Sequence, residues 1–264
     1  MGAWPIGARA QQSSPRTQTG KRIGVLLFAT PESEPNLAAF LGGLRELGYI
    51  EGKNIFIEYR YAEGKPERLR GLAAELVANK PDLIFALGGD VAPSVRVATN
   101  TIPIVVAVSN DPVQAGLVAS LAHPGGNITG VTFVSSDLAA KRLQFLREIA
   151  PKLTRVGVIW NPDHVDPEYR ETQIAGKELG IQIQSLEVRS LDDFDAAFEM
   201  ATNAQIQALI PITSRLMLTK RQRIIEFSTQ RRLLLASGFG PWTKEGALLS
   251  YGPDTDASTW RAAS

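Results

Sequence analysis

The sequence predicts an α/β protein with two lobes, each a parallel sheet covered by helices. Short apolar runs alternate with amphipathic segments from residue 21 onwards. The spacing allows one helix between successive strands, which is typical of parallel strands joined by right-handed crossovers. Near the middle, residues 123–134 (HPGGNITGVTFV) combine a turn cluster with an extended apolar stretch. We interpret this segment as the first crossing from one lobe to the other.

The first half is expected to contain four strands and three helices. Residues 22–28 (RIGVLLF) form a continuous apolar run, which is typical of a strand buried on both faces. The helix that follows, at 35–47, has apolar residues spaced three and four apart and ends at Gly48. The remaining expected elements are strands at 54–61, 82–87 and 104–108 and helices at 66–79 and 91–98.

The second half repeats this alternation without a close sequence repeat. The patterns predict helices at 137–149, 167–179, 192–201 and 215–230, and strands at 155–160, 182–188, 208–211, 233–236 and 247–251.

Composition excludes several functional classes. The 264 residues carry a formal net charge of +1, so no general attraction to nucleic acid or to an anionic membrane is expected. The absence of cysteine excludes disulfides, thiolate zinc sites and cysteine nucleophiles. We find no P-loop, Rossmann glycine fingerprint or nucleophile elbow, and His123 and His164, the only histidines, lack zinc-ligand spacing. No catalytic residue, metal or cofactor is therefore expected.

Residues 1–20 show neither a helical nor a strand period. Ala8-Arg9-Ala10 resembles the small-residue cleavage box of a secretory signal, although a basic region and an apolar region before it are absent. The segment is expected to be a signal-peptide remnant or a disordered tail.

Polar loops follow the predicted strands. In open parallel sheets, ligands bind beyond the carboxyl ends of the strands, and these loops are rich in hydroxyls, amides, glycines and short carboxylates. Each residue alone has an ordinary structural explanation as a helix cap or a tight turn. The polar character of the loops taken together favours a small polar ligand, with Phe239 and Trp242 as a possible apolar wall.

Long stretches of the chain resemble the family of bacterial ABC-transporter substrate-binding proteins related to the tryptophan/tyrosine uptake proteins. The matching segments are 42–69 (GGLRELGYIEGKNIFIEYRYAEGKPERL), 101–132 (TIPIVVAVSNDPVQAGLVASLAHPGGNITGVT), 155–162 (RVGVIWNP) and 248–254 (LLSYGPD). The resemblance implies a type I periplasmic-binding-protein fold, in which two doubly wound lobes close on a ligand by a hinge motion. It also implies a monomeric periplasmic protein that binds an aromatic or other amino-acid-like solute and meets ABC permease subunits in the membrane.

The same resemblance implies which loop residues line the interlobe cleft. They are Thr30, Gly89, Asp90, Asn110, Asp111, Asn161, Thr213 and Phe239. The sequence departs from the family at Asp90, where many relatives have Thr-Pro. A carboxylate there would disfavour a ligand carboxylate or would pair with an amino group.

The expected domains are a tail at 1–20, an N-terminal lobe at 21–131, a C-terminal lobe at 132–251 and a hinge return at 252–264. Family members continue beyond this point, so the resemblance implies a chain truncated at both ends and less stable than its relatives. Three alternatives stay open: a ligand-sensing regulatory domain, although no helix-turn-helix precedes Lys21; an enzyme on a similar scaffold; and a fragment without function.

Overall fold

The computed structural model describes residues 20–34, 36–133, 138–240 and 242–263. Apart from Gly20, the tail expected at 1–20 lies outside the described residues.

The first lobe contains a parallel sheet of five strands, with the order β2-β1-β3-β4-β5. The strands are β1 (Lys21–Leu27), β2 (Ile55–Tyr61), β3 (Leu83–Leu87), β4 (Ile104–Val108) and β5 (Ile128–Thr132). The last of these corresponds to the extended part of segment 123–134, so that segment adds an edge strand before the chain leaves the first sheet.

The second lobe contains another parallel sheet of five strands, with the order β10-β9-β8-β6-β7. Its strands are β6 (Arg155–Trp160), β7 (Gln182–Glu187), β8 (Ala208–Pro211), β9 (Leu234–Ser237) and β10 (Leu249–Ser250). When each sheet is numbered from its own first strand, both have the order 2-1-3-4-5. The two lobes are therefore wound in the same way.

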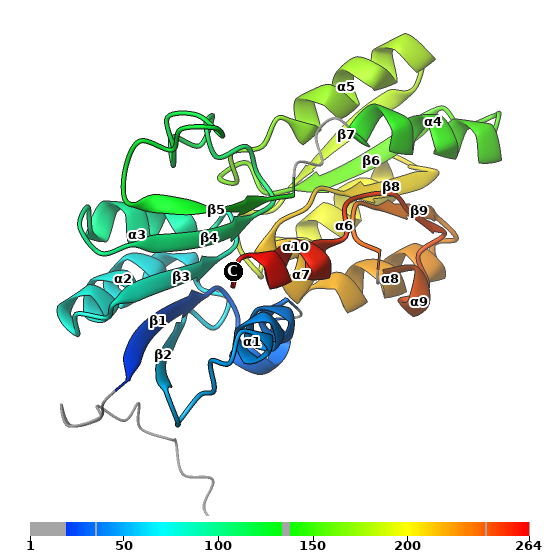
Figure 1. Ribbon diagram of the computed structural model, residues 1–264. Coiled ribbons are helices and arrows are strands. Elements are labelled where there is room, and N and C mark those ends of the chain that lie inside the picture. Colours follow the sequence, from blue (N-terminus) through cyan, green and yellow to red (C-terminus); the bar gives the residue numbers. More distant parts are fainter. Residues whose placement is uncertain (1–19, 35, 134–137, 241, 264) are drawn as a thin grey trace, which may run out of the picture.

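Helices cover both faces of each sheet, as Figure 1 shows. In the first lobe, α2 (Leu69–Ala78) and α3 (Ala92–Ala98) pack on one face and α1 (Leu37–Glu46) on the other. In the second lobe, α4 (Ala139–Ile149) and α5 (Glu168–Leu179) pack opposite α6 (Phe194–Asn203) and α8 (Arg221–Gln230). The predicted α/β fold with doubly wound parallel sheets is confirmed.

Three details differ from the sequence prediction. A 3₁₀ turn at Pro31–Ser33 precedes the helix expected at 35–47. The helix expected at 66–79 begins with a 3₁₀ turn at Pro66–Arg68. The helix expected at 215–230 is divided at Lys220, whose ψ of 16° interrupts the helical path between α7 (Arg215–Thr219) and α8. Two further helices, α9 (Trp242–Glu245) and α10 (Thr255–Arg261), carry no strong sequence period.

Helix α10 returns from the second sheet to the first lobe, where it contacts α1 and β5. The side chain of Asn36, at the start of α1, donates hydrogen bonds to Thr255 Oγ1 at 3.1 Å and Asp256 Oδ1 at 2.9 Å. Asp254 caps α10 by accepting from the backbone N–H groups of Asp256 and Ala257. A second connection between the sheets therefore ends in a defined contact with the first lobe.

A buried ion pair joins α4 to α5 in the second lobe. Arg142 and Glu168 form it with fully buried side chains, and Arg142 also donates to the carbonyl oxygen of Tyr251 at 2.9 Å. Such a pair is costly to break on one side only, because the remaining charge stays buried without its partner.

Replacing Glu168 by Gln is expected to lower the free energy of unfolding by about 3 kcal/mol or more. The exposed pair of Arg223 and Asp195 provides the control, since Asp195 is 82% exposed and its replacement by Ala is expected to cost less than about 1 kcal/mol. Urea denaturation of both variants measures the difference, and equal losses would contradict the burial argument.

Gly130 lies in β5 where only glycine fits. Its φ is 148°, and a Cβ atom there would lie 2.0 Å from the carbonyl oxygen of Val106 on the neighbouring strand β4. Gly130→Ala is therefore expected to destabilise the protein by about 2 kcal/mol or more. Gly126→Ala is the matched control, because no atom lies within 4 Å of its Cβ position. Thermal unfolding should separate the two variants clearly.

Candidate functional site

The loops at the topological switch points of the two sheets meet each other. In each sheet the strand order reverses beside the first strand, between β1 and β3 in one lobe and between β6 and β8 in the other. Ligands of open α/β sheets bind at such points, beyond the carboxyl ends of the strands. The loops after all four strands contribute to one polar cluster between the lobes.

Asp90 and His164 form one contact across this cluster. Asp90 follows β3 and His164 follows β6, and the two side chains are 7% and 1% exposed. His164 Nδ1 lies 2.8 Å from Asp90 Oδ1, while the backbone N–H of Arg215 donates to Asp90 Oδ2 at 2.8 Å. Ser109 Oγ approaches His164 Nε2 at 3.4 Å from the loop after β4. Asp90 therefore binds two different loops of the opposite lobe.

Arg215 and Glu34 form a second contact across the cluster. The guanidinium of Arg215, at the start of α7, donates to Glu34 Oε2 at 2.9 Å and to Asn36 Oδ1 at 3.3 Å. Glu34 also accepts from the backbone N–H of Ala29 at 2.9 Å. Arg215 reaches these partners across Gly88, where a Cβ atom would lie 2.6 Å from Arg215 Cγ. A side chain at position 88 would therefore push this arginine away.

The electrostatic environment shifts three pKa values in the cluster. Burial tends to raise the pKa of Asp90, but His164 and the N–H of Arg215 outweigh it and lower that pKa below its usual value. Burial tends to lower the pKa of His164, but the Asp90 carboxylate outweighs it and raises that pKa above 6.5. Burial raises the pKa of Asp166, two residues further along the same loop. The pair of Asp90 and His164 is thus favoured in its charged form.

Two buried polar atoms in the cluster have no hydrogen-bond partner among the described residues. They are Asn110 Oδ1 and Thr213 Oγ1, whose residues are 1% and 4% exposed. Asn110 Oδ1 lies beside Gly89, 2.6 Å from the position of a Cβ there, and Thr213 Oγ1 lies 2.9 Å from the corresponding position at Gly238. Buried polar atoms are normally paired, so two unpaired ones beside glycines are the groups most available to a bound molecule.

Of the eight residues expected from the sequence, four meet in this cluster: Gly89, Asp90, Asn110 and Thr213. Asp111 and Asn161 are occupied by their own turns, since each accepts hydrogen bonds from backbone N–H groups two residues on. Thr30 is half-buried, and its hydroxyl lies 3.1 Å from that of Ser33.

Phe239 belongs to the hydrophobic core that lies against α8 and α9. It is 6% exposed, and its backbone N–H donates to Ser237 Oγ at 3.0 Å. Trp242 lies in the same core and is 1% exposed. Both aromatic residues expected as a wall of the cleft are therefore buried.

Sequence reasoning missed Glu34 and Arg215 as site residues, and it missed Arg142 as a buried member of an ion pair. Glu34 and Arg215 stand in the polar loops, but nothing in the sequence pairs residues 181 positions apart. Arg142 carried a usable signal, because it occupies the apolar stripe of its helix together with Ala139, Leu143 and Leu146. A charged residue in such a stripe indicates a buried partner.

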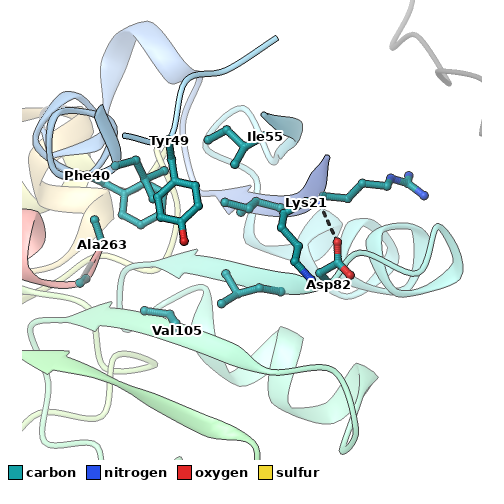
Figure 2. Close-up of a pocket in the computed structure, with 12 residues that line it drawn as sticks. Lys21, Phe40, Tyr49, Ile55, Asp82, Val105 and Ala263 are labelled. Carbon is teal, nitrogen blue, oxygen red and sulfur yellow. Dashed lines mark hydrogen bonds between the residues drawn. The ribbon is translucent and has the colours of Figure 1, made fainter. Parts of the chain in front are cut away.

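A separate apolar groove lies on the first lobe (Figure 2). It has a volume of 370 Å³ and includes the rings of Phe40 and Tyr49, with Asp82 at one end accepting a hydrogen bond from the N–H of Arg22. Residues from the start of β1, β2 and β3 line it, so it lies at the amino ends of the strands, opposite the polar cluster. Its position is not that of a ligand site in an open α/β sheet.

Within the described ranges, no three His, Asp or Glu side chains gather in a way that could hold a metal ion. No described helix has the length and apolar character needed to cross a membrane.

Comparison with solved structures shows the fold class. A conserved domain protein from Vibrio cholerae O1 biovar El Tor superposes with a TM-score of 0.85 at 25% identity, covering 93% of this chain and 83% of that one. An ABC domain from Streptococcus pneumoniae in complex with L-Trp superposes with a TM-score of 0.82 at 20% identity, covering 92% of this chain and 82% of that one. The leucine-binding protein LivK of Thermotoga maritima superposes with a TM-score of 0.60 at 16% identity, covering 83% of this chain and 63% of that one. The fold is that of type I periplasmic binding proteins.

Sequence comparison shows the family. A tyrosine-binding protein of Clostridioides difficile (strain R20291) is 26% identical over 262 residues, which are 97% of this chain and 75% of that protein. The family model of ABC transporter substrate binding proteins matches residues 23–263, which span both sheets and α10. The chain therefore belongs to the family of ABC transporter substrate-binding proteins.

Proposed function

We propose that this protein binds a small organic solute, aromatic or otherwise amino-acid-like, in an interlobe cleft and delivers it to the permease of an ABC importer. It works in the periplasm, as a monomer, and catalyses no reaction. The observation that carries this proposal is the buried polar cluster, to which both lobes contribute at their switch points.

The two unpaired atoms support a polar solute in particular. Asn110 Oδ1 is an acceptor and Thr213 Oγ1 can donate or accept, so together they suit a molecule that carries both kinds of group. The tyrosine-binding relative is named for such a molecule, an amino acid with an aromatic side chain. The formal net charge of +1 favours no nucleic-acid partner.

The domain arrangement is part of the proposal. We assign the N-terminal lobe to residues 21–131, the C-terminal lobe to 132–251 and the return to the first lobe to 252–264. The strand order within each sheet and the contact of α10 with α1 support a division near these residues, although β5 of the first sheet extends to Thr132. The connections between the two lobes would then form the hinge about which the lobes open.

A thermal-shift screen tests the proposal. The purified chain is expected to unfold cooperatively and to gain about 2.7 kcal/mol from a solute at a hundred times its dissociation constant. Aromatic amino acids should give the shift, with aliphatic amino acids, aromatic acids and nucleosides as the compared classes. Cooperative unfolding without a shift from any class would contradict the proposal.

Two variants connect the solute to the polar cluster. Asn110→Ala and Thr213→Val are each expected to weaken binding by about 2- to 12-fold, since each removes one hydrogen bond of about 0.5–1.5 kcal/mol. Asn100→Ala is the control, because Asn100 is exposed at the end of α3, away from the cluster. Isothermal titration calorimetry measures the three affinities, and a loss in the control as large as in the other two would place the solute elsewhere.

A further inference from the structure

The two lobes touch through ionisable side chains of their own. Asp90 of the first lobe and His164 of the second are in direct contact at 2.8 Å. Both side chains are more than nine-tenths buried. Any opening of the lobes along this line must separate the two groups and expose them to water.

The charges around His164 favour its protonated form. Asp90 faces it from the loop after β3, while Asp166 and Glu168 face it from its own loop and from the start of α5. On the positive side, Arg142 on α4 pairs with Glu168, and Arg215 on α7 acts on Asp90. The carboxylates around the imidazole ring therefore favour a proton on His164.

The other charged and polar groups near His164 do not favour its neutral form. Asp111, after β4, adds a further negative charge that acts on Asp166. Ser109, from the same loop as Asp111, is uncharged and approaches the second ring nitrogen of His164. Glu34 is already paired with Arg215.

We propose that Asp90 and His164 form a proton-dependent latch that holds the two lobes closed before any solute binds. A solute entering the interlobe site must first separate these two side chains, so the latch regulates the site assigned above and rests on that proposed function. The pair of Arg215 and Glu34 crosses the same interface beside this latch.

The sign of the pH dependence of lobe closure follows from the directions of the pKa shifts of His164 and Asp90. When the lobes are apart, His164 and Asp90 are expected to return to ordinary pKa values of about 6.5 and 3.9. Because closure raises the pKa of His164, the latch is at full strength below about pH 6.5 and is lost as pH rises through the raised value. Because closure lowers the pKa of Asp90, the latch is also lost in acid, as pH falls through that lowered value.

The absence of cysteine permits a direct measurement of closure. Ala74→Cys on α2 and Lys177→Cys on α5 place one label on an exposed position of each lobe. Energy transfer between the two dyes is recorded from pH 5 to pH 9 without solute. The ratio of closed to open protein is expected to fall several-fold over one titration centred above pH 6.5, by about tenfold for each unit of pKa shift.

Three variants in the labelled chain isolate the latch. His164→Gln and Asp90→Asn keep a hydrogen-bonding side chain but remove one charge each, and both are expected to abolish the pH dependence. His123→Gln is the matched control, since His123 is the second of only two histidines and is exposed in a turn. It is expected to behave as the unmodified chain does.

A second measurement covers the case in which a latch variant fails to fold. The imidazole resonances of the His123→Gln variant come from His164 alone and are expected to titrate above pH 6.5. The proposal is overturned if that titration lies below pH 6.5, if the distance between the lobes does not change with pH, or if His164→Gln keeps the dependence. Solute is absent throughout, so a failed solute screen and a failed latch are separate results.

Discussion

Between the two lobes, the carboxylates of Glu34 and Asp90 are buried beside Arg215 and His164. The free energy of burying one such charge alone is several kcal/mol, so each side chain requires an opposite charge within reach. Because the paired groups lie on loops of different lobes, this requirement holds those loops, and with them the two lobes, in contact. It also keeps Gly88 and Gly89 free of side chains, because a Cβ at either position would enter the space of these partners.

The shared winding of the sheets explains why the paired residues come from these particular loops. In a parallel sheet every strand ends at the same edge, and the helices that follow β1 and β3 leave that edge on opposite faces. The loops diverge there and leave room for side chains. Since the second sheet diverges in the same way between β6 and β8, the polar residues of one lobe meet those of the other rather than a covered surface.

The sequence allowed the strands and most helices to be predicted, because burial on one or both faces leaves a period in the apolar residues. It also indicated Gly89, Asp90, Asn110 and Thr213, which directly follow buried strands. It did not indicate that Asp90 binds His164, since periodicity describes each element and not the packing of elements 74 residues apart. For Phe239, which is buried in the apolar core, the sequence did not indicate the direction of the ring, because an aromatic residue in a loop can turn inward as readily as toward a ligand.

The place of α10 has a consequence for the order in which the protein can be completed during synthesis. Asn36 at the start of α1 cannot form its hydrogen bond to Thr255 until that residue, 219 positions further along the chain, has been synthesised. At about 5–20 residues per second, a ribosome needs about 10–45 s to supply that partner. From the completion of β5 at Thr132 until Thr255 is made, the first lobe has all five of its strands but lacks the helix that packs beside α1. The lobe that emerges first is thus among the last parts of the molecule to mature, and during this time its uncovered apolar surface is open to chaperones and proteases.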